Sequence, residues 1–146
     1  MKIAIGSDHR GIQQRQFIAD AVAAAGHTPV DRGTCSSESV DYPDIAADVA
    51  SVVASGECDL GVLLCGTGIG VSIAANKIQG IRAAVCCNLD MARLSRQHND
   101  ANILCLSGDA FTEAQFHNMI QVWLSTPFEG GRHARRVDKI KTLDQR

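Results

Sequence analysis

Short apolar runs alternate with longer amphipathic stretches along the chain. Runs with the length and composition of β-strands fall at residues 2–6, 28–31, 60–65, 81–86 and 103–106. The spacing of apolar positions predicts helices over residues 11–25, 44–54, 70–77, 89–96 and 112–124, and a final basic helix over 132–143. Pro43 precedes the second helix and Gly56 follows it, as expected at a helix start and a helix end.

Buried strands separated by helices favour a parallel sheet that is covered on both faces. Because crossover connections are right-handed, few topologies remain. We therefore expect one α/β domain over residues 1–146, a doubly wound three-layer sandwich with a five-stranded parallel sheet of order 2-1-3-4-5. In such a sheet the ligand crevice lies outside the carboxyl ends of the strands, between the loops after the first and third strands.

Composition narrows the possible partners. The 146 residues are 45% hydrophobic and 21% charged, which is typical of a globular domain rather than a disordered chain. A formal net charge of −2 argues against a nucleic-acid-binding surface. Since no apolar run is long enough to cross a bilayer and the N-terminus lacks a signal-peptide pattern, we expect a cytoplasmic protein with no membrane partner.

The cysteines are expected to be reduced thiols, because the chain has no CxxC motif and no secretory signal. Most buried cysteines are simply small apolar residues. Adjacent cysteines form only a strained disulfide, which disfavours a redox protein built on Cys86 and Cys87. The six are Cys35, Cys58, Cys65, Cys86, Cys87 and Cys105.

A glycine-rich loop, CGTGIG at residues 65–70, connects the third strand to a helix. Glycines let the backbone approach an anion closely, and a helix start offers free N–H groups. The spacing matches neither a dinucleotide fingerprint nor a Walker A loop. Cys65 stands at this helix start, where a thiolate is favoured, so it is a candidate base or nucleophile. A tight turn without a ligand, and a core thiol, are the simpler alternatives.

Other candidate binding or catalytic residues lie in three further parts of the sequence. Asp8 and His9 follow the first strand, where such groups bind sugar hydroxyls or phosphate, although Asp8 also suits a helix N-cap. Arg132 and Arg136 share a helix face that suits phosphate, or simply solvent. His98 precedes the fifth strand, at the end of the sheet away from the crevice, so a second subunit would have to bring it near.

Seven segments in order carry a resemblance: GSDH (6–9), DYP (41–43), CGTGIG (65–70), SIAANK (72–77), GIRA (80–83), HND (98–100) and EGGRH (129–133). Through them the chain resembles the ribose-5-phosphate isomerase type B family, which includes galactose-6-phosphate and allose-6-phosphate isomerases. The resemblance implies an aldose–ketose isomerase without metal or cofactor, which interconverts ribose 5-phosphate and ribulose 5-phosphate through a cis-enediolate. It implies Cys65 as the base, His98 as the group that opens the sugar ring, and Thr67 as its helper.

The resemblance also implies a homodimer with shared active sites, possibly assembled into a tetramer, and sugar phosphate as the ligand. The implied substrate-binding residues are Asp8, His9, Tyr42, Gly66, Gly68, Ile69, Gly70, Asn99, Arg132 and Arg136. Two positions depart from the family pattern: Arg10 replaces a small or apolar residue, and Asp109 replaces a phosphate-binding arginine. An isomerase of a six-carbon sugar phosphate and a non-catalytic sugar-phosphate-binding module are therefore the alternatives.

Overall fold

The computed structural model describes residues 1–34 and 38–144, so Cys35 lies outside the described residues. Most elements begin and end within three residues of their predicted bounds. In chain order they are β1 (Lys2–Ser7), the short 3-10 helix η1 (His9–Gly11), α1 (Ile12–Ala24), β2 (Thr28–Asp31), α2 (Tyr42–Ala54), β3 (Leu60–Cys65), α3 (Ile69–Ala75), β4 (Ala83–Val85), α4 (Leu89–Asn99), β5 (Ile103–Ser107), α5 (Glu113–Ser125) and α6 (Arg132–Leu143).

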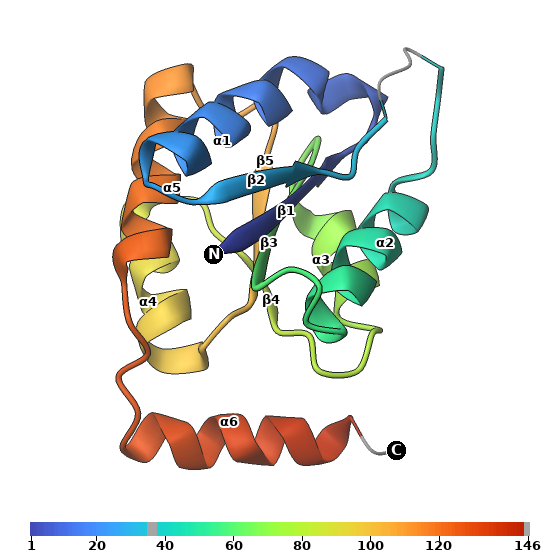
Figure 1. Cartoon of the computed structure of the whole chain (residues 1–146). Helices are drawn as coiled ribbons and strands as arrows, with labels where there is room; N and C mark the ends of the chain where they lie inside the picture. The colour runs from blue at the N-terminus through green and yellow to red at the C-terminus, as the bar shows by residue number, and fades with distance from the viewer. Residues whose placement is uncertain (35–37, 145–146) are drawn as a thin grey trace.

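The strands form a parallel sheet between two helical layers, which confirms the predicted fold class (Figure 1). Alternate residues along each strand face opposite layers. Ile3, Ile5 and Val62 pack with α1, α4 and α5, whose largest buried side chain is Trp123. The other face packs against α2 and α3 and includes Cys65.

The strand order is β2-β1-β3-β5-β4, so the last two strands are reversed relative to the expected 2-1-3-4-5. The burial of the two strands explains the difference. The first four residues of β5 are buried, whereas β4 has only three residues, all partly exposed. The more buried strand takes the interior position and the shorter one forms the edge. As a result, the loop after β5, and not the loop after β4, borders the glycine loop.

Helix α6 lies apart from both layers, beyond the end of the sheet where β1 begins (Figure 1). It packs mainly on α4, where His133 stacks on His98, and its buried residues are His133 and Val137. Ile140 and Leu143 of the same helix are about half exposed. Among the described residues, no helix combines the length and apolar character needed to cross a membrane.

Candidate active site in two halves

The first half of the site is built on the glycine loop. Cys65 ends the fully buried strand β3 and is itself buried. Its Sγ accepts a hydrogen bond from the Gly68 backbone N–H at 3.1 Å. An N–H that donates to sulfur stabilises the thiolate over the thiol, because it places a positive partial charge beside the negative one. Thr67 is exposed next to it, and its Oγ1 accepts from the Ile69 N–H at 3.2 Å.

Glycine is required at two positions of this loop for different reasons. Gly68 has φ +79°, in the left-handed region, and a Cβ there would lie 3.0 Å from the carbonyl carbon of Leu106. A Cβ on Gly70 would lie 2.7 Å from the ring of Tyr42. The Tyr42 ring therefore covers the backbone of Gly70 directly, which brings a predicted substrate-binding side chain from α2 to the loop.

The loop after β1 adds Asp8 and His9 beside the end of β3, since Ser7 pairs with Leu64. Asp8 is buried, and its Oδ1 accepts from the backbone N–H of Arg10 at 3.0 Å, which confirms the expected N-cap. The backbone N–H of Val40 donates to Nδ1 of His9 at 3.3 Å. These bonds fix both residues at the carboxyl edge of the sheet.

The loop after β5 completes this half, and no local pattern in the sequence indicated its contribution. The Gly108 N–H donates to the carbonyl of Cys65 at 2.8 Å, and the Ser107 hydroxyl donates to the carbonyl of Gly66 at 2.6 Å. Asp109 forms an ion pair with Arg10 at 3.3 Å. The two positions that depart from the family pattern thus meet each other over Gly66. Only the correct strand order would have revealed these contacts.

Burial changes the acidity of three of the other described thiols. It raises the pKa of Cys86 to about 11, and it also raises the pKa values of Cys58 and Cys105. Those three groups stay protonated at neutral pH. Cys86 and its exposed neighbour Cys87 are both free thiols, which gives no support to a disulfide between them.

The second half of the site lies at the last turn of α4 and the first turn of α6. The rings of His98 and His133 stack with centroids 4.2 Å apart and planes within 10°. The Oε2 atom of Glu129 lies 3.7 Å from Nε2 of His98 and 3.6 Å from Nε2 of His133. The exposed Arg132 and Arg136 belong to the same helix as His133.

The spacing of this cluster would admit a metal ion, since ligand atoms of His98, Glu129 and His133 all lie within 4.8 Å of one another. The ring geometry does not fit one. A metal bound by two imidazoles lies near the plane of each ring, and two stacked, nearly parallel rings have no such shared position. The cluster is better described as two stacked imidazoles that face one carboxylate.

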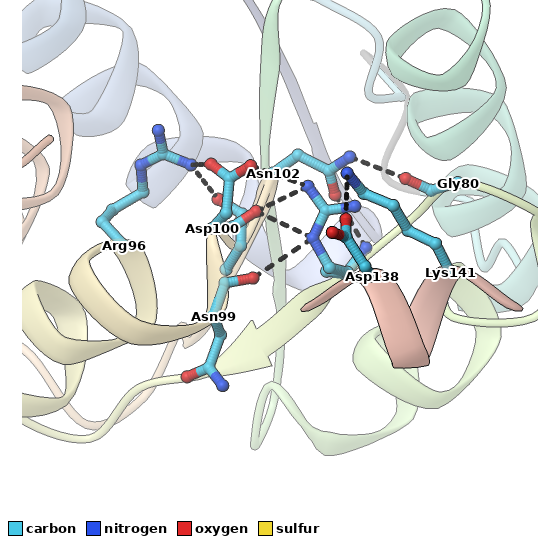
Figure 2. Close-up of polar contacts among 9 residues, drawn as sticks. Gly80, Arg96, Asn99, Asp100, Asn102, Asp138 and Lys141 are labelled. Atoms are coloured by element: carbon cyan, nitrogen blue, oxygen red, sulfur yellow. Dashed lines mark hydrogen bonds and ion pairs between the residues drawn. The ribbon is translucent and has the colours of Figure 1, made fainter. Parts of the chain in front are cut away.

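Helix α4 ends, just after His98, in a strained turn at Asp100. Asp100 is in the left-handed region with φ 45°, where a non-glycine residue costs roughly 1–2 kcal/mol. Arg82 donates to its carbonyl at 2.8 Å, and Arg96 donates to its carboxylate at 3.0 Å. Figure 2 shows the Asn99 side chain pointing away from this network, so its amide remains free to meet a ligand or a second subunit.

The two halves lie at opposite ends of the sheet. Cys65 pairs with Ser107 at the carboxyl end of β5, whereas His98 and Asn99 precede the other end of that strand. Five residues of strand span about 13 Å. A single chain therefore keeps Cys65 and His98 apart. The sequence predicted this separation, since it placed His98 at the end of the sheet away from Cys65.

The comparisons with known proteins agree with this architecture. Residues 3–140 match the family described as Ribose/Galactose Isomerase. Ribose-5-phosphate isomerase B of Escherichia coli is 46% identical over 145 residues, covering 99% of this chain and 97% of the relative. The structure of ribose-5-phosphate isomerase B from Clostridium thermocellum superposes with a TM-score of 0.95 at 52% identity, over 99% and 98% of the two chains.

A third structure, ribose-5-phosphate isomerase B of Mycoplasma genitalium with bound ribulose-5-phosphate, gives a TM-score of 0.94 at 40% identity, over 99% and 96% of the chains. The parallel α/β fold and its glycine loop thus belong to a class of sugar isomerases. This chain is a member of the ribose/galactose isomerase family, which confirms the family that the seven segments indicated.

The link between Gly68 and Cys65 can be tested with Gly68→Ala. A Cβ at this φ and so close to Leu106 must shift the loop and weaken the N–H bond to the sulfur. We expect alkylation of Cys65 by iodoacetamide to slow severalfold, measured by peptide mass spectrometry. Gly56→Ala is the matched control, because Gly56 has φ +81° with open space around it. Gly56→Ala should lose about 1 kcal/mol of stability and Gly68→Ala more, because only Gly68 also meets backbone. Equal alkylation rates at Cys65 in both variants would contradict the link.

Proposed function

We propose that this chain is a ribose-5-phosphate isomerase that interconverts ribose 5-phosphate and ribulose 5-phosphate through a cis-enediolate, without a metal ion or cofactor. The observation that carries the proposal is the Cys65 sulfur, held at the carboxyl end of β3 by the Gly68 N–H. The name of the Escherichia coli relative and the ribulose-5-phosphate bound to the Mycoplasma genitalium relative support this substrate.

Ring opening comes first, because ribose 5-phosphate is mostly a closed furanose. The bond between C1 and the ring oxygen breaks, and the ring oxygen takes its electron pair together with a proton from His98. The hydroxyl on C1 loses its proton to solvent and becomes the aldehyde. We assign His98 as the proton donor because imidazole exchanges protons near neutral pH. Thr67, exposed beside Cys65, is placed to orient the sugar at this step.

Isomerisation then needs a base at C2. The Cys65 thiolate takes the C2 proton, the electron pair forms the C1–C2 double bond, and negative charge develops on O1 of the enediolate. The Cys65 thiol, whose proton exchanges with solvent, then gives a proton to C1, while the proton of the O2 hydroxyl passes to O1. C2 becomes the ketone and O1 becomes a neutral hydroxyl. Backbone N–H groups of the glycine loop, with the Asn99 amide, are suited to stabilise the developing oxyanion. The contacts from Ser107 and Gly108 keep this loop fixed through the reaction.

A homodimer supplies the complete site. One protomer contributes Cys65, Thr67, Asp8, His9 and Tyr42, and its partner contributes the His98 half with Arg132 and Arg136. Those two arginines point from an exposed helix face, where they can grip the phosphate of a substrate bound to the other protomer. The half-exposed Ile140 and Leu143 on the same helix provide apolar surface for such a contact.

A six-carbon sugar phosphate is the second candidate substrate, and the ion pair between Arg10 and Asp109 favours testing it. The Asp109 carboxylate beside Gly66 repels a phosphate dianion, whereas its pairing with Arg10 reduces that repulsion. The relative strength of the Asp109 repulsion and of the Arg10 attraction decides where a phosphate group can bind. A panel of ribose, allose and galactose phosphates, read as ketose formation without added metal or nucleotide, separates the candidates. Phosphate binding without turnover on any of them would indicate a binding module.

Cys65→Ala tests the base. We expect turnover of ribose 5-phosphate to fall by roughly 10²–10⁴-fold, the usual contribution of a general base, while affinity for the substrate changes little. Cys58→Ala is a matched control, because Cys58 is also buried on the same face of the sheet but lies at the opposite end of β3. A Cys65→Ala enzyme with near-normal turnover would overturn the assignment.

His98→Asn tests the ring opener. Turnover of the closed aldose should fall at least tenfold, whereas exchange of the ketose C1 proton with solvent should continue, because ribulose 5-phosphate cannot close into a furanose. The exchange is followed by NMR in deuterated water, with Cys65→Ala as the variant that should lose it. If His98→Asn abolished the exchange as completely as Cys65→Ala, His98 would not be a dedicated ring opener.

A further inference from the structure

Two groups beside His98 have no role in the reaction as described above. Both lie in the EGGRH segment that joins α5 to α6. The backbone N–H of Glu129 donates to the carbonyl of Gln97 on α4 at 3.0 Å, and the His133 N–H donates to the carbonyl of Gly130 at 3.1 Å. The segment is therefore fastened to the last turn of α4, next to His98. Its side chains face that histidine as a consequence of this fastening.

The two stacked imidazoles are not equivalent. His133 is buried, and its pKa is lowered by burial first and then by the nearby His98, Arg132 and Arg136, with Glu129 opposing. His133 is thus neutral at pH 7 and serves as an apolar surface for the ring above it. His98 is about one-third exposed, at 37% of its side chain. His98 is therefore the ring of the pair that can reach solvent or a substrate.

The carboxylate of Glu129 lies at the edge of both rings, where it can hold the imidazole of His98. Its Oε2 lies at 3.6–3.7 Å from both Nε2 atoms, which is ion-pair distance but too long for a good hydrogen bond. A proton on His98 attracts the carboxylate toward that ring, because neutral His133 offers it no competing charge. The imidazole would then be held in one rotamer by the stack below and by the carboxylate at its edge.

We propose that Glu129 is a positioning residue for His98, whose carboxylate, together with the stacked ring of His133, orients the imidazole that donates a proton to the ring oxygen of the sugar. The inference rests on the proposed function for the role of His98. It assigns no contact between Glu129 and the substrate. It also explains why one segment carries both Glu129 and Arg132, since the same short turn fixes the ring-opening group and the phosphate ligand in one half-site.

Glu129→Gln keeps the shape of the side chain and removes its charge. We expect kcat for ribose 5-phosphate to fall about tenfold or more, with KM within about twofold, because a charge-assisted contact is lost only where His98 acts. Exchange of the ketose C1 proton should be unchanged, and Glu129→Asp should recover part of kcat. Asp138→Asn is the matched control: it removes one exposed carboxylate from the same region and should leave every value unchanged.

Two results would overturn the proposal. One is an equal loss of turnover and of C1-proton exchange in Glu129→Gln, which indicates a merely structural role. The other is an unchanged kcat, with or without a rise in KM. The ring nitrogen signals of ¹⁵N-labelled His98, measured without substrate, should also shift in Glu129→Gln and not in Asp138→Asn. This signal does not depend on turnover, so a protein inactive on every sugar phosphate would refute the proposed function while the contact with Glu129 was still tested.

Discussion

The pairing of β3 with β5 is the contact on which the first half of the site depends. It places Cys65 opposite Ser107, so the loops after the two strands meet. The Gly108 N–H and the Ser107 hydroxyl then bind the carbonyls of Cys65 and Gly66. With those carbonyls turned toward β5, the loop turns back at Gly68 and directs its N–H to the Cys65 sulfur. A different neighbour for β3 would remove the support of the glycine loop and of Cys65.

Local signals in the sequence were sufficient for the elements and for most of the first half-site. The buried strands β1 and β3 end at Ser7 and Cys65, and the residues that follow them are polar or glycine, so Asp8, His9 and the glycine loop could be placed at the carboxyl edge. The topological rule for parallel sheets then brought these two loops together. Tyr42 was predicted only through the family resemblance, because its approach to Gly70 is a contact between distant segments.

The parts that the sequence did not predict depend on long-range packing. Residues 81–86 and 103–106 look equally suited to strands, and only their burial in the folded chain places β5 inside and β4 at the edge. The roles of Ser107 and Gly108 follow from that choice. His98 on α4 stacks on His133 on α6. The two residues are 35 positions apart in the sequence, and a pattern of apolar positions cannot predict a contact between such distant residues.

We expect each active site to combine Cys65 of one protomer with His98 of the other. The most direct measurement is the activity of a purified heterodimer made from one Cys65→Ala chain and one His98→Asn chain carrying different affinity tags. One of its two sites would hold both intact residues and the other would hold neither, so about half of the activity of a tagged wild-type dimer should return. Activity no higher than that of the two parent homodimers would show that Cys65 and His98 act within a single chain, and would contradict the account.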